Sequence, residues 1–561
     1  MSGHAEDQTI GEELGPPAIP DGDGVQVDIA KQGLARPAAL MAVGTTLSRA
    51  TGLGRTIAMA FALGVAESRL ADAYNLANTL PNVIYELLLG GILTSVFIPV
   101  LVEQLRKREH DDAWKAVSAM VTTALTVLVV MTGIVVLAAP LIIDFFTLQV
   151  PASQRAAQQD LATFFLIVFA PQVVFYGIAA IGQSLLNAHG KFGVPMFLPI
   201  VNNVIVIATF LLFAFLTMGT PTDQSVFEVA WQRWLLGAGT TAGIAVMALI
   251  YIPFLRRLPG KIRFNLNFRH PAVLKLGKLA FWSVIYVFVN AIGFSVSFYL
   301  AGGVQGGVTA YATAFAFFQL PIGIAAVSIM TALVPKLSAH HVDGDNAAFL
   351  DRLADGVRLT SLLMLPATAG LIVLAQPMIQ FLLEHGIVGA DSVSLVSSVL
   401  VYFAVGLLPF AIWQLQIQAC YTRQDARTPA LLNVWHNVAT IALDFLLYPA
   451  MGIEGLALAH SLGYVAGVIV AAVVLRRQIG SLTGRRIASE MSRVIAASAF
   501  CAAAIFGVMA VVAQFTSPGE WRSLLDLILG AAVGLAVFLG AARLFGVHDL
   551  SMFKRILPGK S

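Results

Sequence analysis

The chain is dominated by apolar segments that are long enough to cross a lipid bilayer as helices. A membrane-spanning helix needs about 20 predominantly apolar residues, and fourteen segments of the 561-residue chain meet that length. They run over 37–64, 71–103, 115–143, 159–187, 192–217, 231–255, 273–300, 306–335, 356–383, 391–420, 428–451, 453–475, 491–514 and 522–545. Only 12% of the residues are charged, whereas soluble proteins average about a quarter. The sequence therefore predicts an all-α polytopic membrane protein with 14 transmembrane helices.

The positions of the Lys and Arg residues predict how these helices are oriented. Of the 34 cations, 28 lie in the two termini and in the connections after even-numbered helices, and four lie in the other connections. Cationic connections remain on the cytoplasmic side of a membrane, so both termini are predicted to be cytoplasmic. Residues 1–36 hold seven acids and no apolar run, which predicts a disordered tail without the features of a cleaved signal peptide.

Two proline-based patterns recur along the chain, as in transporters built from two related halves. Pro195 precedes Asn203 as Pro429 precedes Asn437, 234 residues later, and Pro81 corresponds to Pro321, 240 residues later. We therefore expect two pseudo-repeated six-helix lobes followed by two extra helices. The predicted parts are the tail 1–36, an N-lobe 37–255, a basic linker 256–278, a C-lobe 279–475 whose first helix starts near 273, a cytoplasmic loop 476–490, the two extra helices 491–545 and a cytoplasmic C-terminus 546–561.

Arg49 and Arg55 lie within the first apolar segment, on either side of Gly52 and Gly54. A cation at this depth is costly unless it faces a partner or a water-filled cavity, and a guanidinium binds phosphate with two hydrogen bonds. On a straight helix the two side chains point about 120° apart, so we expect the glycines to allow a bend that turns both toward one anion-binding cavity of a transporter. The alternative is a structural ion pair with Asp72 or Glu86.

The second segment carries a stripe of polar residues at helical spacing: Asn75, Asn78, Asn82 and Glu86. Side chains three or four residues apart share one helix face, and we expect this face to line the cavity. A single Asn in a membrane helix more often forms interhelical hydrogen bonds, which is the alternative. Glu86 pairs with an arginine or, when protonated, serves as a site for a coupling proton.

The predicted C-lobe also holds polar side chains within its helices: Asn290, Asn433, His436, Asn437, Asp444 and His460. Oxygen ligands from two helices can bind a small cation, so Asn290, Asn433 and Asn437 are candidate ligands for Na⁺. Hydrogen bonds between packed helices explain the same residues, and we favour that interpretation. His460 is expected to be a buried histidine with satisfied hydrogen bonds.

Motifs of soluble catalysis are missing from the sequence. It contains no P-loop, HExxH or GxSxG motif, and two cysteines, Cys420 and Cys501, cannot form a cysteine-based metal site. We predict a membrane transporter rather than an enzyme, with no cofactor. Its energy would come from a Na⁺ or H⁺ gradient, the membrane potential or the gradient of the substrate.

Five sequence blocks resemble the MurJ (MviN) family of the MOP superfamily. They are LSRATGLGR (47–55), ADAYNLANTLPN (71–82), GGILTSVFIP (90–99), GQSLLNAHGKFGVP (182–195) and TRQDARTP (422–429). The resemblance runs from about 37 to 550. It implies a multi-pass protein of the bacterial plasma (inner) membrane that flips lipid II, with a V-shaped two-lobe bundle and alternating access. It also implies that the two helices over 491–545 form a groove for the polyprenyl tail.

The resemblance implies roles for individual residues. Arg49 and Arg55 match the cavity arginines of the family, and Asp72 and Pro195 match other important positions. The chain departs from well-known members at two places: Tyr85 and Glu86 occupy positions where those members have basic residues, and Ala316 replaces an arginine. Only two positive charges of the cavity, Arg49 and Arg55, therefore remain. A set reduced in this way resembles that of actinobacterial-type members. Structural or gating roles are expected for Ser48, Gly52, Gly54, Pro81, Pro195, Pro321 and Pro429.

The sequence thus predicts a flippase that moves lipid II, or a related polyprenyl-pyrophosphate sugar, to the outer leaflet. Arg49 and Arg55 would hold the pyrophosphate, while Asp72, Glu86 and the Asn stripe complete the site and contact sugars or peptide. One alternative is another MOP exporter, for a polysaccharide unit or a cationic drug. A second is a non-transporting scaffold that recruits cell-wall synthesis proteins. The expected partners are the lipid substrate and membrane lipids, without nucleic acid.

Overall fold

The computed structural model describes residues 35–86, 110–191, 193–217, 219–480 and 484–547. Over these residues the chain is helical and contains no strand, which confirms the all-α fold class. Part of the predicted segment 71–103, with the block at 90–99, lies outside the described residues. The side chain of Glu86, with both of its expected roles, also lies outside them.

The first half of the chain forms eight described helices. They are α1 (Ala35–Leu63), α2 (Leu70–Glu86), α4 (His110–Phe146), α5 (Ala152–Phe169), α6 (Gln172–Ala188), α7 (Gly193–Leu216), the short α8 (Asp223–Glu228) and α9 (Ala230–Leu255). The connection from α9 to the next helix, 256–270, is the first part of the predicted basic linker.

The second half begins with α10 and ends with a helical hairpin. Its elements are α10 (Pro271–Ala301), α11 (Gly307–Pro321), the π-helix η2 (Ile322–Ala326), α12 (Val327–Val342), α13 (Asn346–Leu383), α14 (Ala390–Val405), α15 (Leu407–Thr422), α16 (Arg427–Met451), α17 (Ile453–Ile479), α18 (Gly484–Phe515) and α19 (Glu520–Leu544). Each of the fourteen predicted segments overlaps one of the helices in the two halves or a broken pair of them.

Length and apolar composition alone support a smaller number of spans. Among the described residues, ten helices are long and apolar enough to cross a membrane, and α14 with α15 adds an eleventh if their 50° bend is counted within one span. The three predicted segments that do not meet this criterion correspond to α1, to α2 and to α11 with its continuation. The segment of α1 carries Arg49 and Arg55, and α2 is described only as far as Glu86. The helix that begins as α11 is interrupted by the π-helix η2.

The prolines expected to matter lie where a helix starts or changes its geometry. Pro195 and Pro429 lie in the first turns of α7 and α16, where a backbone N–H would have no helical partner. Pro321 ends α11 and is followed by the π-helix, because a proline lacks the N–H that continues the α-helical hydrogen bonds. Pro81 lies within α2.

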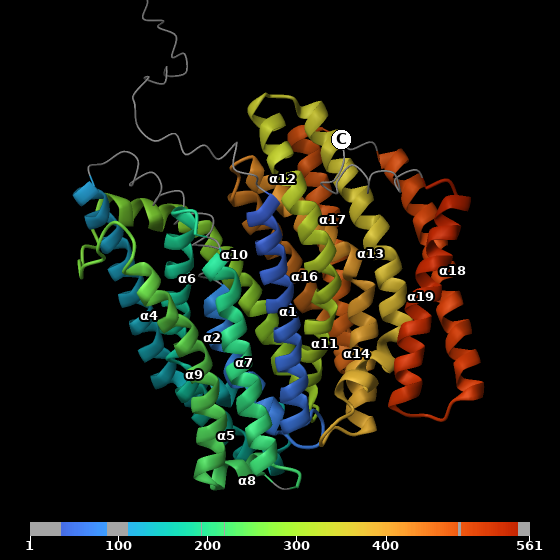
Figure 1. Cartoon of the computed structure of the whole chain (residues 1–561), viewed down its shortest axis with the longest axis horizontal. Coiled ribbons are helices and arrows are strands. Elements are labelled where there is room, and N and C mark those ends of the chain that lie inside the picture. Colours follow the sequence, from blue (N-terminus) through green and yellow to red (C-terminus); the bar gives the residue numbers. More distant parts are fainter. Residues whose placement is uncertain (1–34, 87–109, 192, 218, 481–483, 548–561) are drawn as a thin grey trace, which may run out of the picture.

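The helices pair in the same way in both halves of the molecule. α1 packs along α7, and α10 packs along α16 (Figure 1). α7 and α16 each have a proline in the first turn, Pro195 and Pro429. The asparagine eight residues after each proline bonds to the partner helix. The amide of Asn203 donates to the Ser48 carbonyl (3.2 Å), and that of Asn437 donates to Asn290 Oδ1 (3.0 Å).

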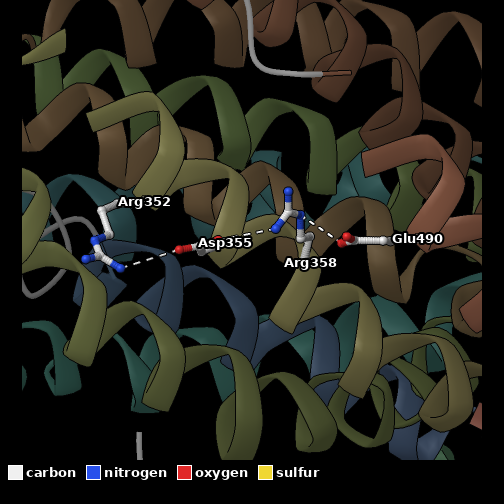
Figure 2. Close-up of polar contacts among 4 residues, drawn as sticks. All are labelled: Arg352, Asp355, Arg358 and Glu490. Carbon is white, nitrogen blue, oxygen red and sulfur yellow. Dashed lines mark hydrogen bonds and ion pairs between the residues drawn. The ribbon is translucent and has the colours of Figure 1, made fainter. Parts of the chain in front are cut away.

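The hairpin of α18 and α19 forms one edge of the bundle and packs on α13 (Figure 1). Near one end of α13, Arg358 lies between Asp355, at 3.4 Å, and Glu490 of α18, at 2.9 Å, while Arg352 approaches Asp355 from the other side at 3.5 Å (Figure 2). Toward the other end of α13, Ser523 Oγ of α19 donates to Gln380 Oε1 (2.9 Å). Polar contacts therefore join the hairpin to α13 at two separate levels.

Candidate functional site

The glycines of α1 bring this helix close to α7. α1 is a continuous α-helix from Ala35 to Leu63, without a break at Gly52 or Gly54. A Cβ at Gly52 would lie 3.7 Å from Asn203 Nδ2, and one at Gly54 would lie 3.5 Å from Ile207 Cδ1. Larger side chains would fill this contact, which also contains the hydrogen bond from Asn203 to the Ser48 carbonyl. The glycines therefore serve helix packing.

Arg55 lines a cavity of about 190 Å³ in the middle of the bundle. The cavity is walled by α1, α2 and Phe210 of α7 from the first half and by α11 of the second. Its polar lining includes the three asparagines of the predicted stripe, Asn75, Asn78 and Asn82, together with Thr79 and Thr313. The structure thus brings together Arg55 and the predicted asparagine face.

Several polar groups of this cavity lack a partner among the described residues. Arg55 forms no ion pair there, and the buried atoms Asn78 Oδ1 and Thr313 Oγ1 have no hydrogen-bond partner. Asn75 and Asn82 are partly engaged, since Asn75 Nδ2 donates to Thr309 Oγ1 (3.2 Å) and Asn82 Oδ1 accepts from the Tyr176 hydroxyl (3.1 Å). Buried polar atoms are rarely left unpaired, so this wall is suited to a polar, negatively charged ligand.

Arg49 lies outside this lining, against the second half of the molecule. A Cβ built on Gly323 of η2 would overlap the Arg49 guanidinium, at 0.9 Å from Nη1. The Arg49 side chain can therefore occupy this place only while residue 323 is a glycine. Among the described side chains Arg49 forms no ion pair, and Asp72, the partner considered in the structural alternative, is bonded elsewhere. Arg49 thus contacts η2 of the second half, whereas Arg55 lines the cavity.

A second cavity, of about 380 Å³, adjoins the first and extends into the second half. Thr79, Asn82 and Ala312 contribute to the walls of both. Apart from Val83 of α2, the remaining lining is mostly aromatic and comes from α10, α11, α15, α16 and α17. Sequence reasoning did not single out these aromatic residues, because rings at helical spacing look the same whether they pack in a core or face a cavity.

Asp72 is placed away from the cavity lining, at the start of α11. It is fully buried and accepts hydrogen bonds from the Gly306 N–H (2.8 Å), the Thr309 N–H (2.9 Å) and the Thr309 hydroxyl (2.8 Å). A carboxylate satisfies the free N–H groups at a helix N-terminus and is favoured by the helix dipole. Asp72 therefore joins α2 of the first half to α11 of the second.

Two neighbours of Asp72 extend this junction. Glu67 Oε1 accepts hydrogen bonds from the Gly389 N–H and the Ser392 hydroxyl, both at 2.7 Å. Arg69 is buried, and its guanidinium donates to the Gly302 carbonyl (2.9 Å) and to Gln154 Oε1 (2.7 Å). Burial lowers the pKa of Arg69, and the negative charges of Asp72 and Asp223 oppose this effect.

We call Glu67, Arg69 and Asp72, with their partners in the second half, the interlobe lock. It holds the two halves together at the end where α1 passes into α2. Sequence reasoning placed Asp72 in the substrate site and did not single out Glu67 or Arg69. One signal was available in the sequence. Arg69 is one of only four cations in the connections after odd-numbered helices, which are otherwise poor in Lys and Arg.

The candidate Na⁺ ligands of the second half are bonded to one another. Asn437 Nδ2 donates to Asn290 Oδ1 (3.0 Å) and Asn433 Oδ1 (3.2 Å), and Asn433 Nδ2 donates to the Tyr286 carbonyl (2.7 Å). Within the described residues no group of three or more His, Cys, Asp or Glu side chains is arranged to hold a metal ion. This geometry fits the interpretation as packing hydrogen bonds.

Two other polar residues of the second half are incompletely bonded. Asp444 is fully buried, accepts one hydrogen bond from Ser297 Oγ (2.8 Å), and its Oδ1 has no partner among the described residues. His460 is buried as expected, but its Nε2 also has no partner there, so the expectation of a satisfied histidine is wrong. Its ring lies among aromatic rings, including those of Phe294, Phe315 and Tyr464.

Comparison with known sequences identifies a family that matches most of the chain. A sequence model described as "Lipid II flippase MurJ" matches residues 59–522. The "Probable lipid II flippase MurJ" of Vibrio cholerae is 26% identical over 531 residues, which cover 93% of this chain and 98% of that protein. The "Lipid II flippase MurJ" of Burkholderia cenocepacia is 26% identical over 439 residues, which cover 77% of this chain and 82% of that protein.

Comparison with solved structures identifies the same fold. "Lipid II flippase MurJ, inward closed conformation" aligns with a TM-score of 0.73 at 21% identity, covering 92% of this chain and 99% of that one. An outward-facing MATE family multidrug transporter of the MOP superfamily aligns with a TM-score of 0.56 at 14% identity, covering 79% of this chain and 94% of that one. The arrangement of helices is thus shared with transporters of related architecture.

Proposed function

The chain belongs to the lipid II flippase MurJ family, and from this premise we propose how it carries its substrate. It is a membrane transporter and not an enzyme, and it flips lipid II. The transport path is the pair of adjoining cavities between the two halves, and access to it alternates between the two sides of the membrane. Arg55 binds the pyrophosphate that links the lipid to its headgroup.

The observation that carries this proposal is the unpaired state of Arg55 in a cavity with unpaired polar atoms. An intramembrane guanidinium without a carboxylate partner is costly, and a phosphate-bearing ligand supplies the missing charge through bidentate hydrogen bonds. Two other atoms are also unpaired among the described residues, Asn78 Oδ1 and Thr313 Oγ1. The amide oxygen of Asn78 accepts a hydrogen bond from the same headgroup, and the Thr313 hydroxyl donates one to it. This explanation accounts for all three groups with one ligand.

Arg49 takes a second, conformation-dependent role in this proposal. While it lies against Gly323, it contributes no charge to the Arg55 cavity. Movement of η2 away from α1 would free the guanidinium to turn toward the ligand. The charge that meets the pyrophosphate would then increase as the halves rearrange.

The interlobe lock is proposed to keep the outward side of the cavities closed. The charge distribution predicts that the α1–α2 connection lies on the outer side of the membrane. Breaking the bonds of Asp72, Glu67 and Arg69 to the second half would open that side and release the headgroup. The polyprenyl tail is proposed to stay in lipid along α18 and α19, whose outer faces are apolar, with Phe506 and Leu535 as examples.

A coupling cation, Na⁺ or H⁺, is proposed to act at Asp444. An unpaired buried carboxylate is costly, and a bound cation or proton relieves that cost. Asn290, Asn433 and Asn437 are less suited because their amides are already bonded to one another. The membrane potential remains a second source of energy because the substrate is charged.

The direct test is the exposure of lipid II at the outer surface of cells depleted of their own flippase. The cells receive the intact chain, Arg55→Gln, or the control Arg476→Gln, which changes an exposed cation at the end of α17, all at equal membrane levels. We expect exposure with the intact chain and the control, and its loss with Arg55→Gln. Normal exposure with Arg55→Gln would remove Arg55 from the pyrophosphate site.

A further inference from the structure

The larger cavity has an aromatic interior, which we call the aromatic chamber. Seven aromatic rings line it: Tyr286, Phe294, Phe298, Phe315, Phe410, Trp413 and Tyr464. Its volume of about 380 Å³ lies within the range of about 300–1,000 Å³ for small-molecule sites. Several of the rings are only partly buried, Phe315 and Phe410 among them, so part of each of these rings is exposed at the cavity.

The chamber contains amides but no charged side chain among its described lining residues. The amides of Asn290 and Asn433 are engaged in the bonds to Asn437. Gln319 and Gln414 also line the chamber, and their amides form no hydrogen bond within the described part of the chain. Two amides, each with donors and an acceptor, are therefore free to bind a ligand.

This lining selects among chemical classes of ligand. A ligand with a phosphate or a carboxylate is best bound by Lys or Arg, and a cationic drug by Asp or Glu. Neither kind of side chain is among the described residues of this lining. A lipid tail gains nothing from free amides, whose burial without partners is costly. A sugar ring has an apolar C–H face, which fits the negative face of an aromatic ring, and hydroxyl groups at its edge, which fit amides. The lining matches a neutral carbohydrate.

The chamber also has the right position relative to Arg55. Thr79, Asn82 and Ala312 belong to the walls of both cavities, so one extended ligand can occupy both. We propose that the aromatic chamber is a carbohydrate subsite, which takes the sugar portion of the substrate while Arg55 holds the pyrophosphate. This inference rests on the proposed function and adds to it a second subsite with a different chemistry.

Phe410 and Gln414 provide the sharpest test of this subsite. They lie four residues apart on α15, so the ring and the amide project from the same helix face. Phe410→Leu removes a ring and keeps an apolar side chain. Gln414→Leu removes the amide and keeps a side chain of similar size. The matched control is Phe215→Leu on α7, where the ring is 81% exposed outside the cavities.

The experiment measures the binding of two lipids to the purified full chain. One is polyprenyl pyrophosphate without sugar, and the other is the same lipid carrying an N-acetylated disaccharide. The Phe410→Leu/Gln414→Leu variant is expected to bind the sugar-bearing lipid roughly tenfold more weakly, as expected for the loss of one ring contact and one hydrogen bond. Its affinity for the bare lipid should be unchanged, and the control should match the intact chain for both lipids.

The outcomes separate this inference from the proposed function. Arg55→Gln should weaken the binding of both lipids; if it weakens neither, the pyrophosphate site fails, whatever the chamber variants do. Unchanged binding of the sugar-bearing lipid by the chamber variant would overturn the carbohydrate subsite. An equal loss for both lipids, with an unchanged melting temperature, would overturn it as well. The single Gln414→Leu variant, which leaves the ring packing intact, should retain part of the selective loss.

Discussion

Arg49 and Arg55 lie six residues apart on one continuous helix and meet different surroundings. Arg55 faces the cavity between the halves, whereas Arg49 reaches across to Gly323. The angle of about 120° between them on a straight helix accounts for the difference. One arginine is thus available to a ligand in this state, and the other takes part in the contact between the halves.

The contact between Arg49 and Gly323 predicts a strong coupling between the two positions. Gly323→Ala should displace the flexible end of Arg49 and slow flipping several-fold, with a small effect on stability of about 0.5 kcal/mol. In an Arg49→Ala background the same substitution should have no further effect, because the atom that it displaces is gone. A double-mutant cycle of flipping rates measures this coupling, and additive effects would contradict it.

Asp72→Asn should weaken the junction between α2 and α11. The amide retains one oxygen acceptor but loses the charge and one of the acceptors that cap the helix, which is expected to cost about 1–2 kcal/mol. Thermal unfolding of the purified protein measures this loss. The exposed Asp391→Asn serves as the control, and an unchanged melting temperature for Asp72→Asn would argue against the capping role.

Part of the site was predictable at the level of single residues. Arg55 and the face of Asn75, Asn78 and Asn82 follow from the cost of polar groups in a membrane and from helical periodicity. The contacts of Arg49 and Asp72 did not follow, because both involve partners more than 230 residues away in the chain. Local sequence patterns contain no information on such pairings.

At the scale of elements, the hairpin of α18 and α19 depends on α13 for its position. Arg358 has a side chain only 9% exposed and lies between two acids, whereas the side chain of Arg352 is 51% exposed (Figure 2). Removing one partner of a largely buried ion pair leaves an uncompensated charge, whereas exposed pairs contribute little. The two arginines therefore form a matched pair for experiment.

Arg358→Gln should loosen the start of α18, with a cost of about 1–3 kcal/mol, while Arg352→Gln should cost less than about 1 kcal/mol. Hydrogen–deuterium exchange in the first described turns of α18 measures the difference. Faster exchange is expected only in the Arg358 variant. Equal exchange in both variants would show that the pair with Glu490 does not hold the hairpin.

The apolar part of most helices was predictable, and their full length and the irregular turns were less so. Apolar length and flanking charge place α16 closely, predicted over 428–451 and found over Arg427–Met451. In contrast, α13 begins ten residues before its predicted segment 356–383, at Asn346. The π-helix after Pro321 and the 50° bend between α14 and α15 depend on how each helix packs on its neighbours. For α1, the sequence did not indicate that Gly52 and Gly54 lie against Asn203 and Ile207 of α7.

At the scale of the whole molecule, the interlobe lock predicts that transport stops when its end of the bundle is held closed. The Ala66 N–H donates to Ser392 Oγ (2.9 Å), which places these two positions on facing segments. A disulfide between Ala66→Cys and Ser392→Cys should abolish flipping, and reduction should restore it. The native cysteines, Cys420 and Cys501, are buried and are replaced first; each single cysteine variant serves as a control.

The cross-linked protein should still bind the pyrophosphate-linked lipid, because the cavities do not include the linked positions. Flipping by the fully cross-linked protein would contradict alternating access through this end. The division into two halves was indicated by the repeated prolines. Which segments meet at the junction was not, because the closing contacts lie in short connections without a repeated pattern.

Most partners of the lock in the second half are main-chain groups: the Gly302 carbonyl and the N–H groups of Gly306, Thr309 and Gly389. Main-chain groups are common to almost all amino acids, but the receiving side is not free to change everywhere. Gly306 has φ +76°, and a Cβ there would lie 2.6 Å from the Val65 carbonyl oxygen. At Gly389 a Cβ would lie 3.7 Å from Glu67 Oε1, which is an ordinary contact. Over evolutionary time, side chains should therefore change at Gly389 with closure intact, whereas Gly306 and the side chains of Glu67, Arg69 and Asp72 should be kept.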